Sequence, residues 1–223
     1  MKSFGDKVLA FYQSLEDIPA VPEGVGVLFP HRDPGAWKVM QEFYRQYYPD
    51  NNPRTFLIGI NPGRLGAGIT GIPFTDPVRL QEVCGIANQF DQKPELSSKF
   101  IYQVISSLGG ADSFYHKYYI TSVSPLGFVQ SGKNLNYYDL KELQDTWETF
   151  MVEALQRQIK LGASRIAFSI GQGKNIKYLQ YLNKQYQLFE EIIPLPHPRW
   201  VMQYRLKRLD EFIELYRSKL SEQ

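Results

Sequence analysis

The feature of this sequence that most constrains its fold is the alternation of short apolar runs with longer stretches of helical period. Residues 55–60 (TFLIGI) are apolar at almost every position, which is typical of a strand covered on both faces of a sheet. Further strands are predicted at residues 118–123, 165–170 and 188–193. Strands that alternate with helices form mainly parallel sheets between helical layers. The sequence therefore predicts an α/β fold, a three-layer α/β/α arrangement with a short, mainly four-stranded parallel central sheet.

Helical periodicity fills the segments around these strands. Helices are predicted at 6–15, from Pro34 up to Tyr47, through Val83, at 97–108, at 140–161, between the third and fourth strands, and at 203–220. A chain of 223 residues suits one mid-sized domain, and no linker or internal repeat is visible. We expect a single domain over residues 1–223, in which residues 1–50 form a helical lead-in.

Charge and cysteine content exclude several classes of protein. The chain has 25 basic and 23 acidic residues, a formal net charge of +2, so it is not polybasic as a whole. Its single cysteine, Cys84, excludes an internal disulfide and a four-cysteine zinc site and indicates a reducing compartment. No signal peptide or transmembrane run is visible. We expect a monomeric protein of the cytoplasm (prokaryotic cytosol or nucleoid) without membrane association.

Metal and cysteine chemistry find little support in the sequence. His31, His116 and His197 are far apart, and no two of them have the i, i+4 spacing of a helical metal site, so no metal is expected. Cys84 stands in an apolar segment (LQEVCGI) and is interpreted as a small buried hydrophobic residue rather than a nucleophile.

Two glycine-rich segments are similar to nucleotide-binding loops only in part. Residues 66–71 match G-x-G-x-x-G, but Pro73 follows at once and five residues separate the motif from the strand, which does not suit a helix facing a pyrophosphate. Residues 169–175 lack the spacing of a phosphate loop and are interpreted as a strand-to-helix turn. No cofactor is expected.

The carboxyl ends of the predicted strands indicate where a ligand would bind. Ligands of open α/β sheets bind outside these ends. The loops that leave them are residues 61–77, 124–137, 171–174 and 194–201, and three of the four are rich in Gly, Pro, Asn, Ser or His. We expect the functional site to be formed by these loops.

Asn61 and His197 are the polar residues of these loops with the best case for a role. Asn61 follows a buried strand and is fixed by Pro62 and Gly63, so its amide can hold a water, although Asn-Pro-Gly is also ordinary turn chemistry. His197 stands between prolines at the end of the last strand, which restricts its backbone, although a lone histidine is often structural.

Several segments together form a more specific pattern. Four segments are similar to motifs that occur together in one enzyme family. GINPGR at 59–64 and TGIPF at 70–74 are similar to GMNPGP and TGVPF, and SPLGF at 124–128 and SGKNL at 131–135 are similar to CPLLF and SGRNL. A terminal His-Pro element follows in the same order as in that family. Over residues 55–215 the chain thus resembles the uracil-DNA glycosylase superfamily, and most closely its single-strand-selective monofunctional (SMUG-like) branch.

The resemblance implies an enzyme of base-excision repair that flips a damaged base out of DNA and cleaves its N-glycosidic bond without a cofactor or metal. It implies that Asn61 positions the attacking water, that Phe74 stacks on the base, and that His197 donates to the base oxygen on which charge develops. The remaining implied base contacts are Pro62, Gly63 and Ser122. The implied DNA contacts are Ser124, Ser131, Lys133, Arg199, Trp200 and Arg205.

Two positions depart from the family pattern. Ser122 stands where the family has an asparagine that reads the uracil edge, and a hydroxyl cannot reproduce a two-atom amide match. The final motif HPSPRN is replaced by HPRWVM, in which Trp200 and Met202 are candidates for the wedge that fills the vacated stack, or Trp200 caps the terminal helix.

These departures leave three functions open. The first is a monofunctional glycosylase that excises uracil or a related deaminated base from double- or single-stranded DNA. A second is a superfamily member specific for another base, such as hypoxanthine or xanthine. The third is a catalytically weak DNA-binding or nucleotide-binding protein that retains the fold.

Overall fold

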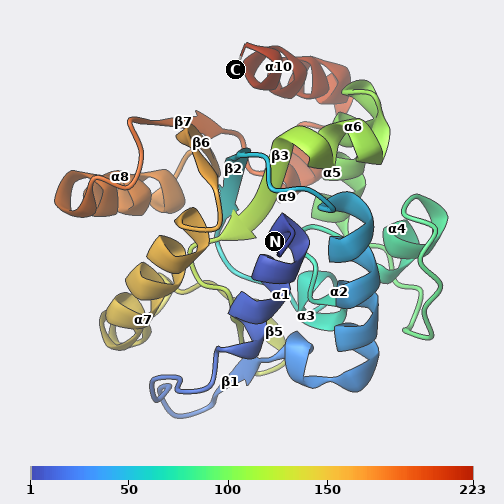
Figure 1. Cartoon of the computed structure of the whole chain (residues 1–223). Coiled ribbons are helices and arrows are strands. Elements are labelled where there is room, and N and C mark those ends of the chain that lie inside the picture. Colours follow the sequence, from blue (N-terminus) through green and yellow to red (C-terminus); the bar gives the residue numbers. More distant parts are fainter. Residues whose placement is uncertain (1, 223) are drawn as a thin grey trace.

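The centre of the molecule is a parallel sheet of four strands in the order β3-β2-β6-β7 (Figure 1). This is a computed structural model, and it describes residues 2–222. The strands are β2 (Arg54–Gly59), β3 (Tyr118–Ser122), β6 (Ala163–Ile170) and β7 (Glu191–Leu195). The predicted fold class, an α/β fold with a short parallel central sheet, is confirmed.

The fourth strand lies about three residues later than predicted. The side-chain amide of Asn183 donates to the carbonyl of Phe189 (3.0 Å) and accepts from its N–H (2.8 Å). These bonds hold residues around Phe189 in the connection before β7. Pro194 is inside the strand, which is compatible with its missing N–H because β7 is an edge of the sheet.

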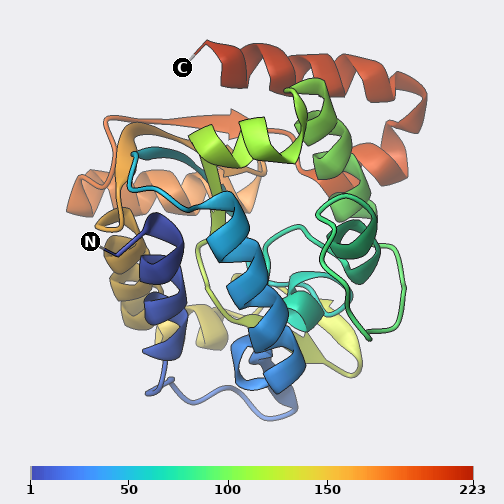
Figure 2. The same cartoon turned by 45° about the vertical axis from the view of Figure 1, so that its right-hand side comes forward.

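One face of the sheet packs against α1, α7 and α8 (Figures 1 and 2). Their bounds are α1 (Phe4–Gln13), α7 (Lys141–Ile159) and α8 (Lys174–Tyr186). On β3, Tyr119 and Thr121 both donate through their hydroxyls to the buried amide oxygen of Gln158 on α7. Alternate residues of β3 therefore point toward this helical layer, as a pleated strand requires.

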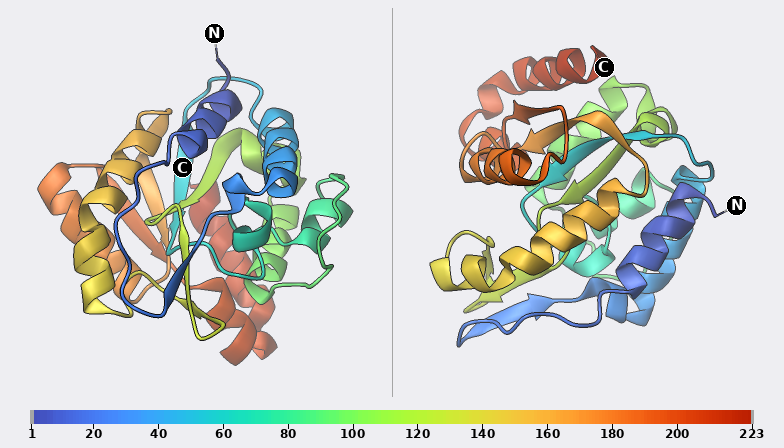
Figure 3. Two further views of the ribbon diagram at one scale, coloured as in Figure 1. Left: turned by 90° about the horizontal axis from the view of Figure 1, so that it is seen from below. Right: turned by 60° about the vertical axis from the view of Figure 1, so that its left-hand side comes forward.

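The opposite face packs against α5 and the C-terminal helices (Figure 3). The hydroxyl of Tyr118 on β3 donates to the carbonyl of Leu220 at 2.7 Å, which ties this face to the last helix. The bounds in this layer are α5 (Leu96–Ser107), α9 (Pro198–Tyr204), the 3-10 turn η2 (Leu206–Arg208) and α10 (Leu209–Ser221). The terminal helix predicted at 203–220 is wrong in this respect, since α9 begins inside the expected loop and the chain turns before α10.

The described residues form four further helices and a second 3-10 turn. They are η1 (Pro30–Arg32), α2 (Pro34–Tyr47), α3 (Ala67–Thr70), α4 (Pro77–Glu82) and α6 (Gly110–Lys117). The sequence did not predict α6, because it begins with a glycine and its period is broken by polar residues on most sides. In the lead-in, α1 and α2 approach so closely that a Cβ on Gly5 would lie 2.1 Å from the carbonyl oxygen of Tyr44.

A second, three-stranded sheet was also not predicted. Its order is β1-β4-β5, antiparallel, with β1 (Val25–Leu28) from the lead-in and β4 (Gly127–Gln130) and β5 (Lys133–Leu135) from the segment expected to be a loop. The turn of the β4–β5 hairpin is Ser131-Gly132, with φ of +48° and +71°, as a two-residue type I′ turn requires. A Cβ on Gly127 would lie 2.3 Å from the carbonyl oxygen of Pro62, so this sheet packs directly on the Asn61–Pro62 loop.

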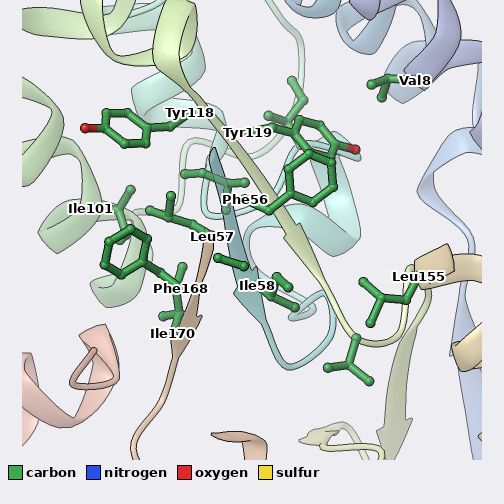
Figure 4. Close-up of a cluster of buried hydrophobic side chains, with 14 of the residues drawn as sticks. Val8, Phe56, Leu57, Ile58, Ile101, Tyr118, Tyr119, Leu155, Phe168 and Ile170 are labelled. Atoms are coloured by element: carbon green, nitrogen blue, oxygen red, sulfur yellow. The ribbon is translucent and has the colours of Figure 1, made fainter. Parts of the chain in front are cut away.

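The hydrophobic core follows both faces of the parallel sheet, as Figure 4 shows. Phe56 and Ile58 of β2 lie on the side of Val8 and Leu155, and Leu57 lies on the side of Ile101. All of these side chains are buried. Among residues 2–222, no helix combines the length and the apolar character needed to cross a membrane.

Candidate active site

The order of the strands locates the site. The chain goes from β2 outward to β3 on one side and later returns to place β6 on the other side of β2, so its direction across the sheet reverses between β2 and β6. The carboxyl ends of two strands that flank such a reversal border a crevice in which ligands of α/β proteins bind. Here a cavity of about 600 Å³ opens at that point.

Most of the predicted site residues line this cavity. They come from three separate segments of the chain and meet only through the fold. The predicted residues at the cavity wall are Asn61, Pro62, Gly63, Phe74, Ser122, His197, Arg199 and Trp200.

Both atoms of the Asn61 amide are held by the β5 segment. Its Oδ1 accepts from the N–H of Tyr137 at 3.0 Å, and its Nδ2 donates to the carbonyl of Leu135 at 3.2 Å and to that of Pro62 at 3.3 Å. The Tyr137 N–H can only donate, so these partners fix which amide atom is the oxygen. A carbonyl oxygen has two lone pairs. The second lone pair of Oδ1 therefore remains for a water or a substrate group.

Phe74 has a backbone conformation that is rare for its residue type. Its φ is +52°, in the left-handed region, where a non-glycine residue carries a cost of order 1–3 kcal/mol. The hydroxyl of Thr70 donates to the carbonyl of Thr75 (2.7 Å) and accepts from the N–H of Ile72 (3.2 Å), which closes the loop on both sides of Phe74. A Cβ on Gly59 would lie 2.9 Å from the Phe74 ring, so the ring rests against the backbone of β2.

His197 is held as a neutral hydrogen-bond donor. It is the N-cap of α9, and its Nδ1 accepts from the N–H of Arg199 at 3.2 Å. Because Nδ1 is the acceptor, the proton of the neutral ring is on Nε2. Burial, with a smaller contribution from the positive charge of Arg199, lowers the pKa of His197 from 6.5 to about 4. Its ring centroid lies 6.4 Å from that of Phe74.

Ser122 lines the cavity, and its hydroxyl hydrogen is already used in a hydrogen bond within the protein. It is 6% exposed, and its hydroxyl donates to the carbonyl of Ser124 at 2.6 Å. The hydroxyl thus faces the cavity with lone pairs and can accept a hydrogen bond there. At the family's amide position this chain offers an acceptor only.

Four of the predicted DNA contacts do not line the cavity: Ser124, Ser131, Lys133 and Arg205. Ser124 is fully buried and its hydroxyl donates to the carbonyl of Leu126 at 2.7 Å, so its prediction as a DNA contact is wrong. Ser131 and Lys133 are exposed in and beside the turn of the β4–β5 hairpin, outside the cavity.

The residues after His197 form one rim of the cavity. Trp200 is 39% exposed, its ring meets that of Phe212 edge to face at 5.7 Å, and the guanidinium of Arg205 lies 4.7 Å over it. It therefore packs on the terminal helix and also borders the cavity. Met202 is only 7% exposed, which corrects its interpretation as a wedge residue. Tyr204, which the sequence did not single out, lines the rim and is 66% exposed.

Other lining residues were also missed. Asn175 and Thr121 are buried, and the further lining residues that were not predicted include Glu95, Ser97, Asn134, Asn136, Tyr138, Gln172 and Gln203. A signal was available for Asn175, since it ends the glycine-rich segment 169–175 at the end of β6.

In the described part of the chain, no three His, Cys, Asp or Glu side chains are grouped as a metal site would need. Cys84 is buried beside the Tyr102 hydroxyl (3.1 Å), as the sequence predicted.

Comparisons with known proteins show the family of this chain. The family model described as the uracil DNA glycosylase superfamily matches residues 45–221. Among curated proteins, the single-strand selective monofunctional uracil-DNA glycosylase of Rattus norvegicus is 26% identical over 169 residues. That match covers 67% of this chain and spans 60% of the length of the rat protein.

Among solved structures, the crystal structure of wild-type Pedobacter heparinus SMUG2 is 40% identical and superposes with a TM-score of 0.96. The likeness covers 100% of this chain and 98% of that one, the lead-in included. The chain therefore belongs to the uracil-DNA glycosylase superfamily, and its relatives are of the SMUG-like branch, as the sequence motifs indicated.

The state of His197 gives a direct prediction. Because its pKa is lowered to about 4, we expect the Nε2–H tautomer of the neutral ring to persist as the pH falls from 7 to about 5. In the unfolded chain the His197 ring takes up a second proton near pH 6.5, whereas in the folded protein it does so only near pH 4. The free energy of unfolding is therefore unaffected by this group above pH 6.5 and falls as the pH goes from 6.5 toward 4.

Two-bond ¹H–¹⁵N spectra of the histidine rings, recorded over a range of pH, give both the tautomer and the pKa of His197. A neutral ring with the proton on Nδ1, or a titration midpoint near pH 6.5, would contradict the geometry described for this side chain.

Proposed function

We propose that the protein is a monofunctional DNA glycosylase that excises uracil or a related deaminated base by attack of water on the N-glycosidic bond. The observation that supports this most is the juxtaposition of the His197 Nε2–H donor, the Phe74 ring and the held Asn61 amide in one cavity. Those three groups match the three tasks of the reaction, which are leaving-group stabilisation, stacking and positioning of water.

His197 is suited to the leaving group. Cleavage of the bond leaves negative charge on the base and an oxocarbenium-like sugar, so a donor at the base oxygen stabilises the transition state more than the ground state. A neutral Nε2–H does this without transferring its proton. Removal of one such donor costs on the order of 10² to 10³ in rate.

Asn61 is suited to the water. Its free Oδ1 lone pair can accept a hydrogen from a water while the Tyr137 and Leu135 bonds keep the amide in place. An amide is a weak base, but the developing oxocarbenium ion is an easily attacked electrophile, so orientation matters more than proton abstraction.

The surroundings of the cavity suit DNA. Lys174 and Arg199 line it, and Arg205 stacks on Trp200 nearby, which supplies positive charge for phosphate contacts. Exposed aromatic side chains at the rim can occupy the place of a base that has left the stack. Tyr204 has the more accessible ring of the two rim aromatics, so we propose it beside Trp200 for this role.

A substrate survey tests the activity. With oligonucleotides that contain uracil, hypoxanthine or xanthine, in single and double strands, we expect alkali-labile abasic sites on at least one of them. Asn61→Ala and His197→Ala are each expected to lower the single-turnover rate by about 10² or more while DNA binding stays near the parent value.

Two results would contradict this proposal. Release of no base from any substrate would favour a DNA-binding protein that retains the fold. Strand cleavage with a borohydride-trapped adduct would instead implicate an amine such as Lys174 as the nucleophile, because that side chain lines the cavity.

Ser122 tests the choice of base. Its hydroxyl can accept from a ring N–H, which uracil, hypoxanthine and xanthine all offer, so the position discriminates poorly among them. Replacement Ser122→Asn adds a donor for the carbonyl beside that N–H, and we expect about tenfold faster release of uracil, since a buried group left without its partner costs about 1–3 kcal/mol.

The measurement is the ratio of the variant's rate to the parent's rate on each of the three bases, taken together with a melting curve. Asparagine is larger than serine, and a strained pocket would lower the melting temperature. An unchanged ratio in a variant of parental stability would mean that another residue reads the base edge.

A further inference from the structure

A buried amide continues the sheet where β2 and β6 separate. The β2–β6 ladder ends at the pair Ile58 and Ser169, and the backbone of β6 does not pair with β2 beyond it. In its place, the Nδ2 of Asn175 lies within hydrogen-bond distance of three oxygens: Ile58 O (3.2 Å), Gly59 O (3.3 Å) and Ser169 Oγ (3.3 Å). Asn175 is 2% exposed and lines the cavity. It therefore holds the end of the strand that leads into Asn61.

The other atom of this amide leads to Asn61 by a second route. The Oδ1 of Asn175 accepts from the hydroxyl of Tyr137 at 3.1 Å, and Tyr137 is fully buried. The backbone N–H of the same tyrosine donates to Oδ1 of Asn61 at 3.0 Å. One side chain on α8 thus constrains Asn61 both from its own strand and from the segment that orients its amide.

Its hydrogen bonds make Asn175 unsuited to reading a base. The two hydrogens of Nδ2 are directed at protein oxygens, and Oδ1 is engaged by Tyr137. Turning the amide toward a ligand would leave the buried carbonyls of Ile58 and Gly59 without this donor, which is unfavourable. The arrangement fits a residue that acts on the site through its neighbours.

We propose that Asn175 is a positioning residue that, together with Tyr137, fixes the Asn61 amide at the separation of β2 and β6. The kinetic part of this proposal rests on the proposed function. Small displacements of a positioned group can cost up to about 10² in rate. Loss of either partner is therefore expected to slow base release without weakening DNA binding.

Two variants interrupt the hydrogen bonds that connect Asn175 to Asn61 through Tyr137. Tyr137→Phe deletes one hydroxyl and leaves the backbone donor in place, and Asn175→Ala removes the whole amide. We expect single-turnover rates at saturating enzyme to fall about tenfold for Tyr137→Phe and up to about 10² for Asn175→Ala, with an unchanged dissociation constant for DNA.

A double-mutant cycle separates positioning from general destabilisation. If the two residues act through Asn61, replacing either of them in an Asn61→Ala background will lower the single-turnover rate by less than about twofold. In a His197→Ala background each will cost its full factor, because that residue is on a different strand end. Equal additional losses in both backgrounds, or parental rates for both single variants, would overturn the proposal.

Asn183 offers a matched control on the same helix. Its amide also bridges backbone groups, the N–H and carbonyl of Phe189, and it does not line the cavity. We expect Asn183→Ala to lower the melting temperature and leave the rate unchanged.

A second readout does not depend on activity. The side-chain NH₂ of Asn61 should give two slowly exchanging amide signals that exchange faster in Tyr137→Phe and Asn175→Ala, but not in Asn183→Ala. Unchanged exchange would overturn the proposal whatever the enzyme does. Faster exchange in a protein that releases no base would contradict only the proposed function.

Discussion

The hydrogen bond from the Tyr137 N–H to the Asn61 side chain is the interaction on which the site depends most. It joins two segments that are 76 residues apart and two sheets of different type. The parallel sheet supplies Asn61, Ser122 and His197 from strand ends, and the turn that follows the small antiparallel sheet supplies the N–H that sets the Asn61 amide. Gly127 allows this contact, because any side chain there would meet the backbone of Pro62. The second sheet is thus a structural part of the site.

The features predicted from the sequence are those with local causes. The β2 strand is a continuous apolar run, α2 begins with an Asp33 cap followed by a proline, and Cys84 is in an apolar segment. Asn61, Phe74 and His197 stand in short motifs that identify the family, so their presence at one cavity could be expected. The tautomer of His197 could not, because it depends on the start of α9, a helix that was expected only after residue 202.

What was missed depends on non-local pairing. Strands β1, β4 and β5 are three or four residues long, and β1 pairs with β4 across about 100 residues of chain, which no local period can indicate. Ser124 was placed at DNA by its motif, yet its hydroxyl is consumed by a carbonyl two residues away. Asn175 acquires its importance only because β6 and β2 part beside it, a consequence of strand order that is visible in three dimensions alone.

We propose that the cavity between β2 and β6 holds a flipped base, with His197 at the base carbonyl oxygen on which negative charge develops as the base leaves. A crystal structure of the Asn61→Ala variant with uracil-containing DNA tests this most directly, because a slow variant keeps its substrate. We expect the base to be stacked on Phe74, with its oxygen beside the glycosidic nitrogen within about 3 Å of His197 Nε2 and a ring N–H facing Ser122. A base that remains in the DNA stack, or one that enters the cavity with this oxygen turned away from His197, would contradict it.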